Sequence, residues 1–306
     1  MERILDGFIA VYYPSFFISC TVLHSLLFYL IVAKTTNAFK AMKYFLIPSN
    51  FVNFSMGLCS FFIQARIVHN TKSMACLCRG PCKYIGPSWC FTGYVILMVP
   101  IVSSSTILNM QTLYYKMATI KKYKNLRRRI FFNSIWYFVP FIVCITYHFY
   151  RFYCTKDQGI RMWSTLQENP QYDFTPYARF GGFENAHGYT STITNILLFI
   201  IGFLTPLIGY YWMKEILKVL VRVRNSFSAH TFLQFRCLVH GLTFQIMLPV
   251  FCFLPIGLFY IYDKYYGSKS LITQFMTCVM LSLPAALEPV LQMHFITPYS
   301  KAIRKM

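Results

Sequence analysis

The chain has 306 residues, of which 56% are hydrophobic and only 12% are charged, and its mean hydropathy is +0.47. A soluble domain carries about twice that share of charged residues, so this composition excludes an ordinary soluble domain and indicates several membrane spans. The formal net charge is +20. Such a charge on one soluble face would indicate nucleic acid. Here the Lys and Arg residues fall between apolar runs, so no nucleic-acid partner is expected.

Seven apolar runs follow one another along the chain, and a bilayer takes about 20 helical residues to cross. The first run is not expected to be a cleaved signal peptide, because its apolar part is too long and because Glu2 and Asp6 precede it. The sequence therefore predicts an all-α membrane protein, with a single bundle of seven transmembrane helices over residues 1–306. The expected spans are about 10–33, 44–65, 89–115, 130–153, 190–213, 238–262 and 271–297.

The segment 80–129 predicts the orientation of the bundle. It begins with a cysteine-bearing loop, continues through 25 uncharged residues, Phe91–Tyr115, and ends in a cationic block at 116–129. Thiols pair in oxidising compartments, and Lys and Arg are retained on the cytoplasmic side. We therefore expect the N-terminus outside and the C-terminus in the cytoplasm. This orientation places 18 of the 29 Lys and Arg residues inside.

Two outer segments and four prolines add detail to this topology. Segments 66–88 and 154–189 are expected to be outer loops, and the longer one resembles a lid or plug because it is too short for a core of its own. Spans six and seven carry two prolines each, and proline kinks a helix. These kinks either shape the packing or act as hinges. The prolines are Pro249, Pro255, Pro284 and Pro289.

The cysteines indicate disulfides rather than a metal site. Five of the 11 cysteines fall in segments that we expect outside: Cys76, Cys78, Cys82, Cys90 and Cys154. Zinc is the alternative, but the spacing lacks the paired CxxC knuckles of structural sites. The chain also contains no P-loop, HExxH or G-x-S-x-G motif. We expect no metal, no cofactor and no enzyme activity.

Glu288 is the single acidic residue within the predicted spans. Ionisable residues inside a membrane are costly and are functional by default. Two interpretations remain open. Glu288 is either a neutral carboxylic acid hydrogen-bonded to neighbouring helices, or a polar switch with Asn53 or Asn109 as partner.

Three motifs lie in and after the second apolar run: residues 60–67 (SFFIQARI), 80–87 (GPCKYIGP) and 90–94 (CFTGY). They resemble the signature of the nematode serpentine receptor class delta family of seven-transmembrane receptors. Residues 242–249 (LTFQIMLP), 287–289 (LEP) and 295–300 (FITPYS) are similar to the sixth span, the seventh span and the tail of that family. The resemblance implies a chemosensory G-protein-coupled receptor in the plasma membrane of sensory neurons, in their cilia. Its partners would be a small external chemical, a heterotrimeric G protein and membrane lipid.

The chain departs from the related rhodopsin-like pattern at the switch positions. Tyr115 stands where an arginine is usual at the inner end of span three, and Lys116 follows it. Phe253 and Pro255 remain close to the sixth-span motif, and Glu288 with Pro289 retains the proline of the seventh. A lysine does not reproduce the planar guanidinium. A non-signalling, decayed receptor is therefore one alternative, and a transporter or channel is the other.

The same resemblance implies a disulfide at the outer end of span three. Cys90 lies at the usual distance from the inner arginine position in rhodopsin-like receptors, and Cys154 is the cysteine of the second outer loop. We expect a Cys90–Cys154 bond, with Cys82–Cys90 across the short Gly/Pro loop as the alternative. Either bond requires Cα atoms about 4.4–6.8 Å apart.

A ligand cavity is predicted in the outer half of the bundle, between spans three, five, six and seven. Small-molecule sites are mainly apolar and aromatic with a few polar anchors. The candidate lining residues are Tyr94, Met98, Phe259, Thr273, Gln274 and Thr277.

A G-protein face is predicted at the inner end, around Tyr115, Lys116, the 121–129 cluster and the 214–224 segment. Apolar and basic residues alternate at helical spacing in 214–224, so this segment can accept a partner helix. Anionic lipid is the alternative partner of the same cations. The arginines of this face are Arg127, Arg128, Arg129, Arg222 and Arg224.

Overall fold

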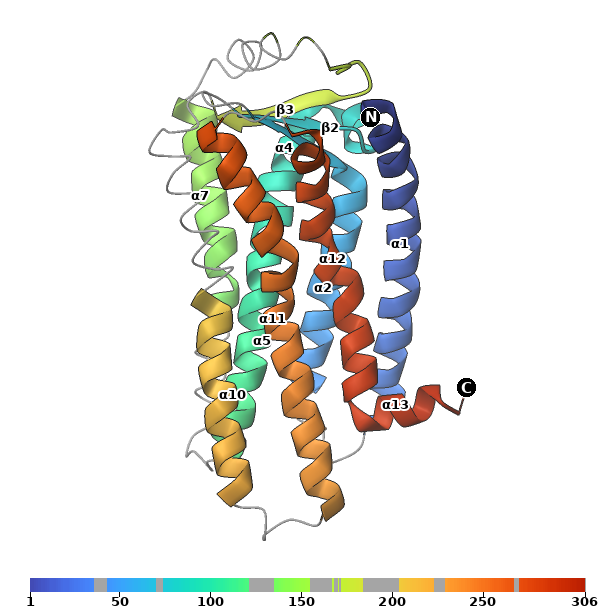
Figure 1. The fold of residues 1–306 in the computed structure, drawn as a ribbon, viewed down its shortest axis with the longest axis vertical. Coiled ribbons are helices and arrows are strands. Elements are labelled where there is room, and N and C mark those ends of the chain that lie inside the picture. The colour runs from blue at the N-terminus through green and yellow to red at the C-terminus, as the bar shows by residue number, and fades with distance from the viewer. Residues whose placement is uncertain are drawn as a thin grey trace.

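The structure is a computed structural model, and it describes residues 1–35, 43–69, 74–120, 135–154, 167, 170, 172–183, 204–222, 229–266 and 270–305. Long helices run side by side along the longest axis of the molecule (Figure 1). The N-terminus lies at one end of the bundle, beside a small β-sheet, and the C-terminus lies at the other. We call these the sheet end and the tail end.

Five of the described helices are long and apolar enough to cross a membrane. In three of them the candidate span is the whole helix: α1 (Glu2–Ala33), α2 (Lys43–Ile63) and α12 (Leu271–Phe295). The fourth candidate span, Ile96–Tyr115, begins in a π-helical turn (Gly93–Met98) and continues into α5 (Val99–Ile120). The fifth, Val239–Phe259, lies within α11 (Ala229–Tyr266).

Two further helices cover parts of the remaining expected spans. Helix α7 (Val139–Cys154) falls in the expected span 130–153, after a short 3₁₀ turn at Ile135–Tyr137. Helix α10 (Thr205–Arg222) begins well inside the expected span 190–213 and continues beyond its end. Residues 190–203 of that span lie outside the described residues.

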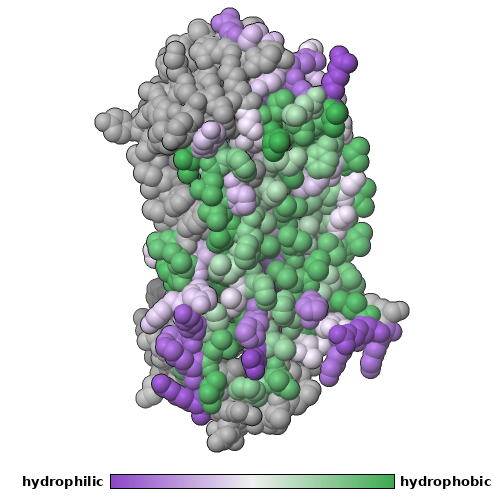
Figure 2. All heavy atoms as spheres, viewed as in Figure 1, coloured by the Kyte–Doolittle hydropathy of each residue, from purple (hydrophilic) through white to green (hydrophobic). Residues whose placement is uncertain are grey.

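The surface of the bundle has the polarity of a membrane protein. Hydrophobic side chains cover most of the middle of the visible face, and hydrophilic side chains gather toward both ends of the long axis (Figure 2). Large apolar side chains such as Val11, Ile18, Phe51, Leu207 and Phe251 are more than three-fifths exposed. A soluble protein rarely exposes so continuous an apolar surface, so this belt is the part that contacts lipid.

The sheet end carries a three-stranded antiparallel sheet, a small addition to a structure whose described residues are mainly helical. Strands β1 (Ala65–His69) and β2 (Met74–Cys78) pair as a hairpin, and β3 (Ala178–Phe183) joins β2 on its other side. We expected both outer segments to be loops. A sheet satisfies the backbone N–H and C=O groups that a loop packed on the bundle would leave unpaired. In Figure 1 the sheet lies across the ends of the helices.

Gly80 allows the hairpin to return tightly onto the end of α2. Its N–H donates to the carbonyl of Ile63 at 3.1 Å, and a Cβ at this position would overlap the Phe62 carbonyl. Only glycine fits such an approach of two backbones. Two short helices, α3 (Cys82–Ile85) and α4 (Pro87–Thr92), then lead into the third span. Gly86 joins them at a φ of 138°, which also favours glycine.

The tail end is held mainly by apolar contacts. Its buried core joins α1, α2, α5, α10, α11 and α12 through side chains such as Leu27, Leu113, Ile216 and Val239. The last helix, α13 (Thr297–Ile303), turns away from α12 and crosses this end of the bundle (Figure 1). Buried Tyr299 fixes α13, because its hydroxyl lies 2.7 Å from Thr35 Oγ1.

Candidate functional site

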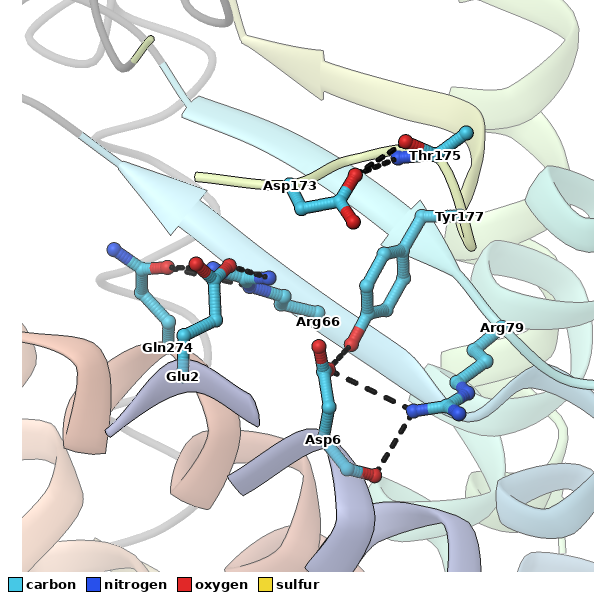
Figure 3. A network of polar contacts seen from close by, with 8 residues as sticks. All are labelled: Glu2, Asp6, Arg66, Arg79, Asp173, Thr175, Tyr177 and Gln274. Carbon is cyan, nitrogen blue, oxygen red and sulfur yellow. Dashed lines mark hydrogen bonds and ion pairs between the residues drawn. The ribbon is translucent and has the colours of Figure 1, made fainter. Parts of the chain in front are cut away.

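Arg66 is the centre of a buried polar group at the sheet end, which we call the Arg66 cluster: Glu2, Arg66 and Gln274. Only 1% of the Arg66 side chain is exposed. Its Nη1 donates to Glu2 Oε1 at 2.9 Å, and its Nη2 and Nε donate to Gln274 Oε1 at 3.0 and 3.3 Å. The cluster therefore joins β1 to the first turn of α1 and to α12, as Figure 3 shows.

Four aromatic rings surround the guanidinium of Arg66. The Phe275 ring centroid lies 4.4 Å from Cζ, and those of Tyr172, Phe174 and Tyr177 lie 5.3–5.4 Å away. Three of these rings come from the segment before β3. Guanidinium groups are attracted to ring faces at such distances, so the second outer segment packs onto Arg66.

A second polar group lies beside the Arg66 cluster. Arg79 Nη1 donates to the Asp6 carbonyl at 2.9 Å and lies 3.6 Å from Asp6 Oδ1. The Tyr177 hydroxyl also donates to Asp6 Oδ1 (Figure 3). Burial raises the pKa of Tyr177, and its hydrogen bond to Asp6 raises that pKa further. The tyrosine is therefore a neutral hydrogen-bond donor.

Glu288 is the centre of a polar group within the bundle, which we call the Glu288 cluster: Ser49, Asn53, Ser105, Asn109, Glu288 and Gln292. Ser49 Oγ donates to Glu288 Oε1 at 2.7 Å and Gln292 Nε2 donates to it at 3.1 Å. Asn109 Nδ2 and Ser105 Oγ lie 3.3 and 3.5 Å from Oε2. The carboxyl group is therefore hydrogen-bonded by side chains from α2, α5 and α12, and Glu288 is 2% exposed.

Both partners expected for Glu288 lie in its cluster, but in different roles. Asn109 bonds to the carboxyl group directly. Asn53 accepts from Ser105 Oγ at 2.8 Å and is joined to Glu288 through that serine. A small cavity borders the cluster, between Met56, Thr106, Gln245 and Pro284. Gln292 Oε1 is buried without a hydrogen-bond partner among the described residues.

The structure divides the six expected ligand-site residues into two groups. Thr273 and Gln274 are 1% exposed at the sheet end of α12, and Gln274 belongs to the Arg66 cluster. Thr277 donates to the Thr273 carbonyl at 2.6 Å. Met98 is buried in the π-helical turn, with Tyr94 partly buried one turn before it. Phe259 differs from these five. It is 57% exposed on α11.

The switch positions are spread along the bundle. Tyr115 packs against Phe45 with ring centroids 4.8 Å apart, which joins α5 to α2. Pro289 is buried in α12, whereas Pro255 is exposed on α11. The side chains of Lys116 and Phe253 lie outside the described residues, although their backbones belong to α5 and α11. The structure therefore brings Glu288 and Pro289 together within one helix, and Tyr115 lies apart from them.

The structure forms the alternative disulfide, Cys82–Cys90, and the expected Cys90–Cys154 bond is corrected. The two Cα atoms lie 5.2 Å apart, within the range that a disulfide requires. The tight turn through α3 and α4 brings them together, and Cys90 has no second bond to offer. Cys78 Sγ lies 2.8 Å from Cys90 Sγ, so three buried sulfur atoms gather at this point.

Most of the expected G-protein face lies outside the described residues. This is the case for Arg127, Arg128, Arg129 and Arg224. Arg222 is exposed at the last residue of α10. One turn earlier in the same helix, Lys218 Nζ lies 3.0 Å from Glu215 Oε1. The cations of α10 therefore lie at the tail end, where that helix ends.

The Arg66 cluster is the part of the site that sequence reasoning missed. Arg66 is the first charge after the apolar run of span two, within a motif already singled out. An arginine in that place is costly to bury unless an anion pairs with it. The acids at positions 2 and 6 precede the first span on the same side of the membrane, and they were the signal for such a partner.

A bundle of long apolar helices, closed at one end by a sheet and a disulfide, defines a multi-pass helical membrane protein. The family described as "Serpentine type 7TM GPCR chemoreceptor Srd" matches residues 9–305. The chain belongs to this family of seven-transmembrane chemoreceptors.

Curated relatives cover nearly the whole chain. Serpentine receptor class delta-63 of Caenorhabditis elegans is 33% identical over 277 residues, which are 89% of this chain and 83% of the relative. Serpentine receptor class delta-59 of the same organism is 28% identical over 292 residues, 95% of this chain and 88% of the relative. Class delta-51 is 24% identical over 309 residues, 100% of this chain and 89% of the relative.

Proposed function

We propose that the chain is a chemosensory G-protein-coupled receptor that binds a small external chemical at the sheet end and signals to a heterotrimeric G protein at the tail end. The observation that carries this proposal is the course of α12. Near its start, Gln274 belongs to the Arg66 cluster, and 14 residues later Glu288 is the centre of the buried polar cluster. One helix therefore connects an outer polar site to the inside of the bundle.

The distribution of charge supports an outer sheet end. Exposed cations lie at the tail end, at Lys214, Lys218 and Arg222 of α10 and at Lys301 and Arg304 of α13. Lys and Arg are enriched on the cytoplasmic side of membrane proteins. A disulfide at the sheet end fits an oxidising compartment. The receptor would span the plasma membrane of sensory neurons, in their cilia, with its N-terminus outside.

The ligand site of this proposal lies below the sheet, between α12 and the third span. Thr273, Gln274 and Thr277 provide polar groups from α12, and Tyr94 and Met98 provide apolar surface from the π-helical turn. Small-molecule sites combine these two kinds of lining. Phe259 is retained only as a position near the edge of the bundle, because its ring is largely exposed.

The output of this proposal passes through Glu288 and Pro289 to the tail end. The Glu288 carboxyl group accepts hydrogen bonds from four side chains, and it can exchange these partners when a helix shifts. Pro289 supplies a bend in the helix at the same place. The G protein would dock around Tyr115, Lys116, the 121–129 segment and Arg222. Anionic lipid is the second partner of these cations.

The experiment that tests the function is a screen of external chemicals in cells that express the chain. Calcium imaging would report the response, and the same cells would be assayed for solute flux. We expect at least one chemical to activate a G protein, and this response should be lost on Glu288→Leu at equal surface expression. Flux without G-protein activation would identify a transporter or channel. A chain that binds a chemical and activates no G protein would be a non-signalling receptor.

A further inference from the structure

Arg66 is held by an anion from its own chain, and this arrangement defines a class of ligand. We propose that the guanidinium of Arg66 binds the carboxylate of a small organic acid and that Glu2 occupies the same place in the ligand-free receptor. The inference rests on the proposed function, since it names the chemical class received at the sheet end.

The first step is that Arg66 needs a negative partner. The guanidinium is charged at any physiological pH, and with 1% of its side chain exposed it has lost nearly all its contact with water. An isolated buried charge is costly unless it is paired. Gln274 and the four surrounding rings are neutral. Among the described contacts of Arg66, Glu2 alone therefore supplies a negative charge.

The second step is that Glu2 holds the guanidinium at one point only. Glu2 contacts Nη1 through one oxygen, Oε1, at 2.9 Å. A guanidinium has five N–H donors and prefers to hold a carboxylate through two parallel hydrogen bonds. The described bonds to Glu2 and Gln274 take one donor each from Nη1, Nη2 and Nε. A carboxylate that is not part of a helix can take the two-point geometry that Glu2 does not.

The third step is that Glu2 can be displaced. It lies in the first turn of α1, and its side chain is 18% exposed, whereas that of Arg66 is 1% exposed. Terminal helical turns open at little free-energy cost compared with the centre of a fold. Asp6, in the next turn, keeps its own bonds to Arg79 and Tyr177. Glu2 can therefore leave Arg66 while α1 stays attached to the sheet end.

The fourth step concerns the body of the ligand. The rings of Tyr172, Phe174 and Phe275 lie within 5.4 Å of the guanidinium carbon and form an aromatic wall. An acid with an apolar or aromatic body gains contact with these rings. A small inorganic anion gains none. The geometry therefore favours organic carboxylates over their neutral amides and over amines of the same shape, which lack the charge or reverse it.

The alternative is that the Glu2–Arg66 pair only clamps α1 to the sheet. Chemical rescue separates the two interpretations. The full-length chain would be purified in detergent micelles, and its thermal unfolding measured as wild type and as Glu2→Gln, with benzoate, benzamide or benzylamine. A ligand that binds the folded state raises the unfolding temperature, and the rise grows with the logarithm of the ligand concentration divided by its Kd. Asp6→Asn is the matched control, because it removes a carboxylate from a neighbouring turn that faces Arg79 instead of Arg66.

We expect Glu2→Gln to lower the unfolding temperature and benzoate to restore it, with an affinity about ten-fold higher than that of the wild type, because the competing anion is gone. Benzamide and benzylamine should restore nothing, and benzoate should not restore Asp6→Asn. Adding Arg66→Lys to Glu2→Gln should weaken the benzoate effect, because an ammonium lacks the two-point geometry.

Three results would overturn the inference. One is an effect of benzoate that is equal in wild type and Glu2→Gln, or absent from both. Another is an equal effect of benzamide. The third is a rescue of Asp6→Asn by benzoate. The thermal assay contains no G protein, so benzoate binding combined with a chemical screen that activates no G protein would refute the proposed function and leave this inference intact. If other chemicals activate a G protein while benzoate has no effect on unfolding, the proposed function stands and this inference is refuted.

Discussion

At the scale of single residues, the described part of the chain buries one arginine, Arg66, and one glutamate, Glu288, and the two have different kinds of partner. Arg66 has a carboxylate partner at 2.9 Å. Glu288 has hydroxyl and amide donors from four side chains. A buried ionisable group is tolerated only when its hydrogen bonds are satisfied. Replacing Arg66 or Glu288 should therefore lower the free energy of unfolding by more than replacing any one of their hydrogen-bond partners.

Replacing Glu288 tests this at the centre of the bundle. Glu288→Leu leaves the Ser49, Asn109 and Gln292 side chains without their acceptor, and each unpaired group costs about 1–3 kcal/mol. We expect a loss of several kcal/mol in the free energy of unfolding in detergent, and a much smaller loss for Glu288→Gln, which keeps an acceptor oxygen. Glu215→Leu, on the partly exposed side of α10, is the control. A Glu288→Leu chain as stable as the wild type would contradict the role of the carboxyl group.

The thiol of Cys78 makes a prediction about pH. Burial raises its pKa from an ordinary value near 9 to about 12. A raised pKa keeps the thiol protonated, and only the thiolate reacts with iodoacetamide. At pH 8 we expect Cys78 to stay unmodified in the folded chain while Cys237, which is exposed, is alkylated. Mass spectrometry of peptides measures both sites in one sample.

The same shift affects stability with a definite sign. Because the folded-state pKa of Cys78 is the higher one, the folded state holds the proton more tightly. The resulting stabilisation is complete below about pH 9 and is lost as the pH rises toward 12.

The alkylation experiment has a clear contrary outcome. Alkylation of Cys78 and Cys237 at equal rates at pH 8 would show that the Cys78 thiol is open to solvent.

At the scale of elements, the helices approach one another most closely where glycine replaces a side chain. Gly241 of α11 lies against Phe295 at the end of α12, and a Cβ at position 241 would overlap the phenylalanine side chain. Gly209 of α10 lies against Ile246 in the same manner, with a Cβ only 2.6 Å from Ile246 Cγ2. The spacing of α10, α11 and α12 therefore depends on the absence of a Cβ atom at Gly209 and Gly241.

Substitution of Gly241 tests that dependence. We expect Gly241→Ala to destabilise the fold by about 1–3 kcal/mol, the usual cost of overpacking a core. Gly257→Ala is the matched control in the same helix, because a Cβ there meets nothing within 4 Å, and alanine is the better helix former. Combining Gly241→Ala with Phe295→Ala should cost less stability than the sum of the two single losses, since the two residues share one space. Equal thermal stability of the two glycine variants would refute the close contact.

The disulfide is also an element-scale feature, because it fixes α3 to α4. Peptide mapping without reductant should find the Cys82 and Cys90 peptides linked. Cys154→Ser should leave this link unchanged, and Cys82→Ser should abolish it. A linked pair of Cys90 and Cys154 peptides in the wild-type chain would restore the bond that the family resemblance implies.

At the scale of the whole molecule, the two ends of the bundle differ in chemistry. The elements at the sheet end are joined to one another by an ion pair, a disulfide and strand pairing. The tail end is joined by an apolar core and carries exposed cations. The positive-inside bias predicts that the tail end faces the cytoplasm.

Antibody labelling of intact cells tests that orientation. An epitope fused before Met1 should be labelled without permeabilisation, and one fused after Met306 should be labelled only after it. Two chains, each with one epitope, serve as controls for each other. Labelling of the C-terminal epitope on intact cells would reverse the orientation and place the Arg66 cluster inside the cell.

Much of this architecture could be predicted from the sequence, because apolar length alone identifies a membrane span. The position of Glu288 in a span identified it as a buried polar centre. The sheet could not be predicted in the same way, because strands of five or six residues, such as 65–69, carry too little periodicity to separate from a loop. The Arg66 cluster was hidden for another reason. Glu2 and Gln274 are separated from it by 64 and 208 residues, and only the folded bundle joins them.

The unequal ends of the bundle also have a mechanical consequence. Helix α12 is held by hydrogen bonds at Gln274, near one end, and at Glu288, whereas its last turns rest on apolar contacts, which can slide without breaking hydrogen bonds. A helix of 25 residues is a lever about 37 Å long. A tilt of about 5° about the Gln274 end moves the far end by about 3 Å, which lies within the range of helix shifts in allosteric proteins. The length of α12 would therefore enlarge a change of partner at Arg66, too small to disturb the sheet, before that change reaches the tail end.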